Sequence, residues 1–312
     1  MENSKNKKRD GFFSYLAAEK PYFFWTLFAL SLGLVIFGIF LQPPEAEISI
    51  DEILEITVPP PDLGFTSYLV GEINSGKVLS KKNGELHLFP ASLTKLMTGI
   101  IVLENFALDE EITISEQAIA MEGEEGGLVA GEKIRAGDLL KILLISSSND
   151  AAKAFEEALE KKGKDFTGLM NEKARKLELF NTAFFDASGL DRQGNFTTIE
   201  DLFILSREIY NQYPYLGEII RQKEAVVYSL DKQITHQIEN TNILLREIDN
   251  LWGGKTGSTP EAKDCLMTIY EFPFSGKDDK IVISIIVLNS SDRFGDTMKL
   301  YNWVKDIIEK IQ

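Results

Sequence analysis

The pair Ser92 and Lys95 is the first feature of this chain that suggests chemistry, within residues 89–99, which read FPASLTKLMTG. Pro90 and the apolar run that follows predict a helix over about 91–106, and positions i and i+3 of a helix share a face. A serine hydroxyl becomes a good nucleophile when a base removes its proton, and a lysine can act as that base when burial or a nearby cation lowers its pKa. The alternative is an ordinary helix start with a capping serine and a solvated lysine.

The second polar motif is Ser147-Ser148-Asn149, which separates the apolar segments GDLLKILLI and DAAKAFEEALEKK. A hydroxyl at Ser147 can relay a proton to a leaving nitrogen, and the amide of Asn149 can hold a substrate carbonyl. The alternative is a polar turn between two helices, in which Ser148 or Asn149 caps the second helix.

The third motif is Lys255-Thr256-Gly257, within NLWGGKTGSTPEA. A phosphate-binding loop requires a glycine five positions before Gly254, where this chain has Asp249, so we reject a nucleotide site. On a strand, Lys255 and Gly257 point to one side and Thr256 to the other. A glycine there lets a peptide backbone approach and pair with the strand edge, and Lys255 supplies positive charge for a carboxylate. The same charge would help to keep Lys95 neutral.

The surrounding periodicity predicts a mixed domain. TSYLVGEI and GKVLSKK flank the turn NSG and predict a β-hairpin, whereas residues 112–162, 165–178 and 198–210 read as mainly helical. The segments EAVVYSL, AKDCLMTIYEF and KIVISIIVLN then read as strands, and FGDTMKLYNWVKDIIEKI as a final helix. The simplest architecture is α/β of the α+β kind: an antiparallel sheet closed by the first and last segments, flanked by helices, with a helical subdomain inserted.

The composition excludes several classes of protein. The 312 residues carry a net charge of −15, which argues against nucleic acid as a partner. Cys265 is the single cysteine, so no intrachain disulfide can form, and with only two histidines we expect no metal and no cofactor. No G-x-S-x-G elbow supports a Ser-His-Asp triad, and His87 reads as a surface or packing residue.

The beginning of the chain resembles a membrane anchor. Basic residues at positions 5–9 precede the uncharged run 23–41, whose 19 residues would span about 28 Å as a helix. No clean A-x-A cleavage site follows, which favours an uncleaved transmembrane span over a signal peptide. The basic flank then predicts that residues 1–22 form a cytoplasmic tail.

The remaining chain would lie outside the membrane. Residues 42–63, with prolines at both ends and an acidic middle, predict a solvated spacer. It would hold a catalytic domain, residues 64–312, on the extracytoplasmic side of a single-pass protein of the cell membrane.

Taken together, the three motifs are specific. They occur in this order with separations of 55 and 108 residues between their first positions, and the combination S-x-x-K, S-x-N and K-T-G marks penicillin-binding proteins and class A β-lactamases. The chain resembles the serine D-alanyl-D-alanine carboxypeptidases, which are low-molecular-weight penicillin-binding proteins with a β-lactamase/transpeptidase-like fold. The likeness covers about 64–312 and includes PASLTKLMT, GEKIRAGDLLKILLISSSNDAA, FFDASGLDRQGNFTT and GGKTGSTPEAKDCL.

This resemblance implies a catalytic role for three residues. Ser92 would be the nucleophile that forms an acyl-enzyme, and Lys95 its general base. Ser147 would pass a proton to the departing D-alanine, and water would resolve the acyl-enzyme. The chain would act on peptidoglycan stem peptides in cell-wall maturation and would bind β-lactams covalently.

The resemblance also implies a set of binding residues. Asn149 would help to hold the peptide, and Lys255 would recognise its terminal carboxylate, with Thr256 and Gly257 along the strand edge. The backbone N–H group of Ser258, together with that of Ser92, would form the oxyanion hole.

Two alternatives remain at this stage. A class A β-lactamase carries a deacylating glutamate in an E-x-x-L-N loop, and the nearest string here, residues 178–181, is one residue short and matches the carboxypeptidases instead. The other alternative is a membrane-tethered, non-catalytic wall-binding protein on the same fold.

Overall fold

The computed structural model describes residues 59–64, 66–273 and 280–310. The chain divides into two units, 1–56 and 57–312, and all described residues belong to the second unit. The predicted tail 1–22, the predicted span 23–41 and most of the predicted spacer lie outside them. None of the helices in the described ranges is both long and apolar enough to cross a bilayer.

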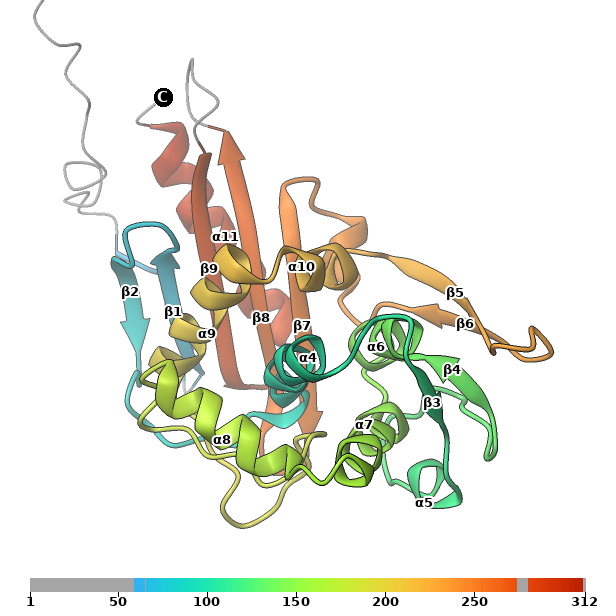
Figure 1. The fold of residues 1–312 in the computed structure, drawn as a ribbon. Coiled ribbons are helices and arrows are strands. Elements are labelled where there is room, and N and C mark those ends of the chain that lie inside the picture. The colour runs from blue at the N-terminus through green and yellow to red at the C-terminus, as the bar shows by residue number, and fades with distance from the viewer. Residues whose placement is uncertain (1–58, 65, 274–279, 311–312) are drawn as a thin grey trace, which may run out of the picture. The chain divides into compact units, whose positions relative to one another are not determined.

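A five-stranded sheet with every neighbouring pair antiparallel forms the centre of the domain (Figure 1). Its spatial order is β2 (Val78–Lys82), β1 (Ser67–Glu72), β9 (Lys280–Ser290), β8 (Lys263–Pro273) and β7 (Leu251–Thr259). The pairing of β1 with β9 confirms that the first and last segments close the sheet, and the predicted hairpin is confirmed in β1–β2. Strand β7 is an edge strand, so one side of its backbone is not covered by another strand of the sheet.

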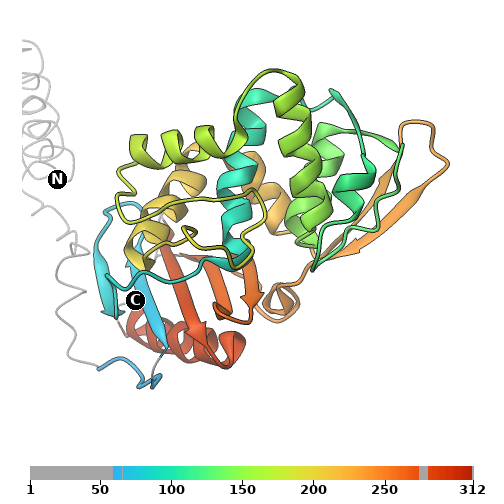
Figure 2. The ribbon, with the colours of Figure 1, turned by 90° about the horizontal axis from the view of Figure 1, so that it is seen from below.

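Helices cover both faces of this sheet, which explains why β8 and β9 are apolar almost throughout. Helix α11 (Arg293–Glu309) packs on β8 and β9 from one side. On the other side, α9 (Ile199–Gln212) contacts β1 and β9, and α10 (Pro214–Ile220) contacts β7. Figure 2 shows α11 alone on its face, with the other helices on the opposite face.

The inserted helical layer is built around α4 (Thr94–Asn105), whose first nine residues are all buried. Around it pack α6 (Ala136–Ile145), α7 (Asn149–Lys161) and α8 (Phe166–Lys176). The predicted helical subdomain is therefore present, and its central helix begins directly after the 3₁₀ turn η1 (Ala91–Leu93).

The mainly helical prediction for residues 112–162 is wrong in its first part. This part holds β3 (Glu111–Thr113), the short helix α5 (Glu116–Ile119) and β4 (Lys133–Arg135), joined by a long loop. Each short strand buries a single central isoleucine between two exposed residues, and three glycines of the loop have positive φ angles, which an α-helix does not permit.

The sequence analysis predicted only one of the two strands of a second small hairpin. Strand β5 (Glu224–Tyr228) follows the expected EAVVYSL segment, but its partner β6 (Thr235–Glu239) was not expected. The hairpin is tied to the loop before β4 by a buried contact between His236 Nε2 and Glu132 Oε1 at 2.7 Å. His87 is exposed, and its ring stacks on Phe196 at 4.7 Å between centroids, which confirms a surface or packing role.

Candidate active site

The three sequence motifs meet where the helical layer joins the edge of the sheet. Ser92 lies in η1 and Lys95 in the first turn of α4, while Ser147 and Asn149 lie at the junction of α6 and α7. Lys255 reaches this junction from the edge strand β7, with its Nζ 2.8 Å from Ser147 Oγ. The structure therefore brings together predicted catalytic and binding residues that are up to 163 positions apart in the chain.

The amine of Lys95 is the central group of this site, and its side chain is fully buried. Its Nζ lies 2.8 Å from Ser92 Oγ, 2.7 Å from Asn149 Oδ1 and 2.8 Å from the carbonyl oxygen of Ser188. Burial lowers the pKa of Lys95 to about 7, against the opposing effect of three nearby carboxylates. At neutral pH a large fraction of the amine is therefore uncharged.

A neutral amine has two hydrogens and one lone pair, and the three contacts of Lys95 match this inventory. The two hydrogens can be donated to Asn149 Oδ1 and to the Ser188 carbonyl, since both are acceptors in these contacts. The lone pair is then left for the hydroxyl hydrogen of Ser92. This arrangement is what a general base needs in order to activate a serine nucleophile.

Two glycines allow the turn that carries Ser92 to sit tightly between neighbouring segments. A Cβ added to Gly257 would lie 2.9 Å from the backbone nitrogen of Ser92, and one added to Gly189 would lie 1.9 Å from the carbonyl oxygen of Ala91. Ala91 itself has a φ of 49°, which is an unfavourable backbone conformation outside glycine. Edge strand β7 therefore passes close to the N–H group of Ser92, where the sequence predicted an oxyanion hole.

Ser147 also has a left-handed backbone, with a φ of 65°. Such a conformation costs a non-glycine residue about 1–3 kcal/mol and is concentrated at functional sites. Ser148 follows with its side chain accepting a hydrogen bond from the N–H group of Ala151 at 2.9 Å, so Ser148 caps α7 as one interpretation of the motif predicted. Because Ser148 serves as the cap, the hydroxyl of Ser147 is available to Lys255.

Lys255 is the second buried lysine of the site. Burial, with smaller contributions from the charges of Lys95 and Arg293, holds its pKa well below its usual value. Its Nζ donates to Ser147 Oγ at 2.8 Å and to the carbonyl of Thr256 at 3.0 Å. A carboxylate bound beside Lys255 would favour its charged form, because an anion offsets the repulsion from the two other cations.

The side chains of successive residues along β7 point to alternate sides at positions 255–257, as predicted. The hydroxyl of Thr256 makes a close hydrogen bond with that of Thr241, whereas Gly257 lies against η1. Ser258 is exposed and pairs with Asp264 of β8. The edge of the strand beside Ser92 is therefore free of bulky side chains at position 257.

Arg293 is a member of this region that the sequence analysis missed. Its Nη1 donates to the carbonyl of Gly257 at 2.8 Å and lies 3.1 Å from Asp264 Oδ1. It is the first residue of α11, and no sequence signal distinguishes it from the other basic residues of the chain. Its charge acts on Lys255 and would add to the attraction for a carboxylate.

The loop before β4 positions Asn149. The Nδ2 group of Asn149 donates to the carbonyl of Glu122 at 2.7 Å, and its backbone N–H group donates to the carbonyl of Glu124 at 2.7 Å. The next residue, Asp150, accepts hydrogen bonds from the N–H group of Gly126 at 2.9 and 3.0 Å. These contacts direct the Oδ1 of Asn149 towards Lys95.

Ser188 is another group that the sequence analysis did not identify. Its carbonyl accepts from Lys95, and its own N–H and hydroxyl groups donate to Asp186 Oδ1 at 2.8 and 2.7 Å. Gly189 N donates to the same oxygen at 2.7 Å. The string D-A-S-G is a recognisable aspartate-centred turn, so the turn was open to prediction, but the use of its carbonyl was not.

This geometry is suited to acyl transfer by a serine nucleophile. It provides a hydroxyl beside a neutral amine, a second hydroxyl linked to a second lysine, and an open strand edge for a peptide. Among the residues that the structure describes, no group of three or more histidine, cysteine and acidic side chains is placed to hold a metal ion. The fold and the site together define a protein of the β-lactamase/transpeptidase-like class.

Comparison with known proteins identifies the family. The sequence profile of the D-alanyl-D-alanine carboxypeptidases, peptidase family S11, matches residues 55–291. The chain belongs to this family. Over 200 residues it is 32% identical to the D-alanyl-D-alanine carboxypeptidase DacF of Bacillus subtilis, which corresponds to 62% of this chain and 51% of that protein. The chain thus covers about half the length of this relative.

The relatives include more than one activity. A D-alanyl-D-alanine endopeptidase of Pseudomonas aeruginosa is 32% identical over 267 residues, or 79% of this chain and 82% of that protein. Among solved structures, the DD-transpeptidase of a Streptomyces strain superposes with a TM-score of 0.70 at 27% identity, covering 79% of this chain and 98% of the other. The fold is therefore β-lactamase/transpeptidase-like, as the sequence predicted.

The lowered pKa of Lys95 predicts a pH-dependent acylation rate. Protonation removes the lone pair that accepts the Ser92 proton, so the rate constant for acylation by a penicillin should fall about tenfold per pH unit below pH 7. Stopped-flow measurement between pH 5 and 9, with tryptophan fluorescence as a check on folding, tests this. A rate that stays constant across this range would contradict a lysine base.

Proposed function

We propose that this protein is a membrane-anchored serine-type D-Ala-D-Ala carboxypeptidase that removes the terminal D-alanine from peptidoglycan stem peptides. The observation that carries the proposal is the buried amine of Lys95, with a pKa of about 7 and its Nζ 2.8 Å from Ser92 Oγ. A lysine in this state has no evident structural purpose, whereas a nucleophilic serine requires it.

The reaction begins when Ser92 Oγ attacks the carbonyl carbon of the penultimate D-alanine and its proton passes to Lys95. Backbone N–H groups of Ser92 and Ser258 would stabilise the negative charge that develops on the carbonyl oxygen. The amide bond then breaks, and its nitrogen must gain a proton to leave as D-alanine. The hydroxyl of Ser147 can deliver that proton, and water then hydrolyses the acyl-enzyme with Lys95 again as base.

The substrate ends in a carboxylate, and the positive charges of the site are arranged to receive it. Lys255 is buried beside Ser147, and Arg293 is held on the carbonyl of Gly257. The substrate backbone would align along the edge of β7 at Thr256 and Gly257, with the amide of Asn149 on its other side. This combination fits a free C-terminal residue, which favours a carboxypeptidase over an endopeptidase.

A β-lactamase would need a carboxylate placed to activate water for deacylation. Glu178, the nearest sequence candidate, is exposed, has a φ of 61° and follows the end of α8. Family membership likewise favours peptides as the natural substrates, with β-lactams as covalent inhibitors that mimic them. A non-catalytic wall-binding protein would have no need of a base held neutral beside Ser92.

We expect a fluorescent penicillin to label the protein covalently through Ser92. The variant Ser92→Ala should show no label, and Ser147→Ala should be acylated about a hundredfold more slowly, because one proton-transfer group is lost. Gel fluorescence after denaturation measures the label, and Ser146→Ala, one residue before the motif, provides a matched control. Labelling that persists in Ser92→Ala would refute the assignment of the nucleophile.

The products formed from stem peptides distinguish the possible activities. Incubation of a pentapeptide stem ending in D-Ala-D-Ala should release one D-alanine per peptide, as measured by mass spectrometry. Dimers cross-linked through a lysine side-chain amine should remain mostly intact, because the carbon that bears the amide nitrogen of their cross-link carries no carboxylate for Lys255. Rapid cleavage of the dimers would instead identify an endopeptidase, and new cross-links would identify a transpeptidase.

We further propose that residues 23–41 anchor the protein in the cell membrane, with residues 1–22 in the cytoplasm and the catalytic domain outside. The support comes from the sequence alone: an uncharged run of 19 residues behind a basic flank. Substrates of the proposed reaction lie outside the membrane, which agrees with this orientation.

Two charges placed in this run should abolish anchoring. A lysine at the centre of a membrane span costs about 2.5–3.5 kcal/mol on insertion scales, so Leu34→Lys with Phe37→Lys should remove the protein from the carbonate-washed membrane fraction. Labelling of intact cells by a membrane-impermeant penicillin should be lost as well. Ser31→Thr, an uncharged change in the same run, is the control, and unchanged retention of the double variant would reject the anchor.

A further inference from the structure

The turn 186–189 supplies one of the two carbonyl-type acceptors of the Lys95 amine, through the backbone carbonyl of Ser188 at 2.8 Å. The other acceptor, Asn149 Oδ1, lies at the start of α7. The lone pair of the neutral amine is left for Ser92 only when both hydrogens are directed to these two acceptors. Because the turn and the helix are separate segments, the geometry of the base depends on the contacts that join them.

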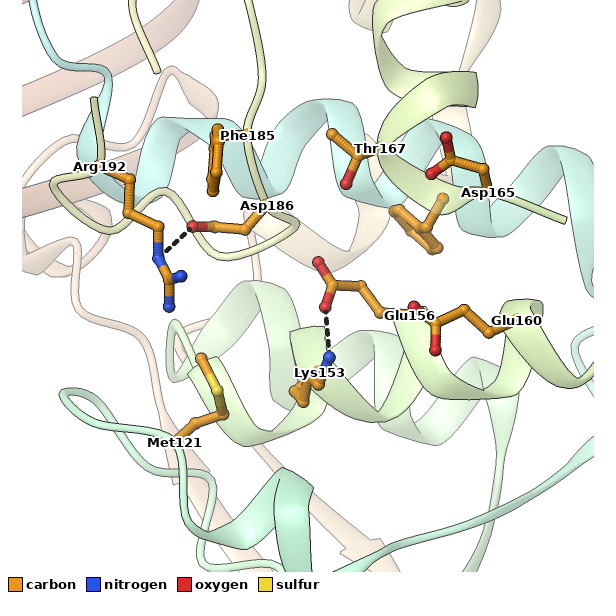
Figure 3. A pocket seen from close by; sticks show the side chains of 10 residues that line it. Met121, Lys153, Glu156, Glu160, Asp165, Thr167, Phe185, Asp186 and Arg192 are labelled. Atoms are coloured by element: carbon orange, nitrogen blue, oxygen red, sulfur yellow. Dashed lines mark hydrogen bonds and ion pairs between the residues drawn. The ribbon is translucent and has the colours of Figure 1, made fainter. Parts of the chain in front are cut away.

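The side chain of Glu156 joins the turn to the helix (Figure 3). Its Oε1 accepts a hydrogen bond from the N–H group of Ala187 at 2.9 Å, and its Oε2 lies 3.0 Å from Lys153 Nζ. Glu156 follows Asn149 by seven positions, which corresponds to two turns and about 10 Å along the same face of α7. One helix therefore carries a direct acceptor of the amine at its first residue and an anchor for the second acceptor two turns later.

The peptide groups of Ala187 are held on two sides. Its N–H group donates to Glu156, and its carbonyl accepts from Thr98 Oγ1 at 2.7 Å, one turn after Lys95 on α4. Ala187 is 1% exposed, so water has little access to its backbone. Loss of the Glu156 acceptor would leave a buried N–H group without this partner, in the same turn that holds Lys95.

The aspartate of the turn does not replace this anchor. Asp186 Oδ1 accepts from the N–H groups of Ser188 and Gly189, and Asp186 Oδ2 lies 3.3 Å from Arg192 Nε. All of these partners belong to the same loop. Asp186 therefore shapes the turn, whereas Glu156 attaches it to α7.

The charged groups around the base and around Glu156 form two sets. The charges with the largest effect on Lys95 are those of Asp186, Glu124 and Asp150, and Lys255 on β7 adds a positive charge. Glu156 faces a cavity of about 310 Å³ whose other charged residues are Lys153, Glu160, Asp165, Asp186 and Arg192. Because Glu156 is not among the charges that act most strongly on Lys95, its hydrogen bond to the turn is the property that bears on the base.

We propose that Glu156 is a positioning residue for the general base. By holding the N–H group of Ala187, its carboxylate keeps the Ser188 carbonyl in place on Lys95. The proposal rests on the serine-peptidase function proposed above and adds a residue that touches neither the substrate nor the nucleophile. When the turn is released, water reaches the amine, and the pKa of Lys95 rises because burial is the main cause of its lowering.

Two conservative variants separate the reach of the side chain from its charge. Glu156→Gln preserves an acceptor oxygen at the same reach and removes the charge, whereas Glu156→Asp preserves the charge and shortens the side chain by one methylene. The rate constant for acylation by a penicillin, followed from pH 5 to 9.5, should keep the parent's midpoint in Glu156→Gln. In Glu156→Asp the midpoint should rise by about one pH unit, so acylation becomes about tenfold slower at pH 6 and nearly equal to the parent's at pH 9.5.

A stronger variant and two controls complete the series. Glu156→Met removes both acceptor and charge and should shift the midpoint at least as far as Glu156→Asp. Glu160→Gln, at an exposed position one turn further along α7, should keep the parent's midpoint. Tyr301→Phe removes a hydrogen bond between α11 and Asn250, so it measures the effect of a general loss of stability on the profile.

The outcomes separate this proposal from the proposed function. If Glu156→Asp and Glu156→Met keep the parent's midpoint, the positioning role is wrong and the peptidase function stands. It is also wrong if these variants lower only the fraction of protein that becomes labelled, since a purely structural role would do this. A shift in Glu156→Gln as large as that in Glu156→Asp would assign the effect to charge and reject the hydrogen bond. A parent protein that no penicillin acylates would overturn the proposed function together with this inference.

Discussion

The proposed chemistry of this protein depends on one buried amine, a large fraction of which is uncharged near neutral pH. Lys95 has three oxygen partners, and three carboxylates nearby favour its protonation, yet burial outweighs them and lowers its pKa to about 7. Burial here requires a complete helical layer, because α4 must be covered by α6, α7 and α8 before its first turn is withdrawn from water. The large apolar core therefore lowers the pKa of Lys95 in addition to stabilising the fold.

The second lysine, Lys255, makes the charge of the site sensitive to a bound anion. Lys255 is also buried, and the nearby positive charges of Lys95 and Arg293 disfavour its protonated form. An anion is the partner that relieves this repulsion, so the site without substrate is prepared for a carboxylate. The backbone strain at Ala91 and Ser147 belongs to the same arrangement, since both residues have positive φ angles beside the reactive hydroxyls.

Several groups that position the site are backbone atoms. The carbonyl of Ser188 holds Lys95, and the carbonyls of Glu122 and Glu124 hold Asn149. Any residue type supplies a carbonyl, so a sequence pattern cannot identify these partners. The same limitation explains the error at residues 112–135, where short strands with one buried isoleucine each are too brief to establish a period of two against the helical segments that follow.

Local sequence patterns were enough to predict the candidate reactive side chains and most of the regular elements. Ser92, Lys95, Ser147, Asn149 and Lys255 could be selected from spacing and residue type, and the long strands β8 and β9 and the helices α4, α7 and α11 follow from sustained periodicity. The burial of the two lysines, the left-handed backbone of Ser147 and the position of Arg293 became apparent only in the folded domain. The physical reason is that pKa values and binding cavities depend on how segments distant in the chain exclude water together, which no local pattern contains.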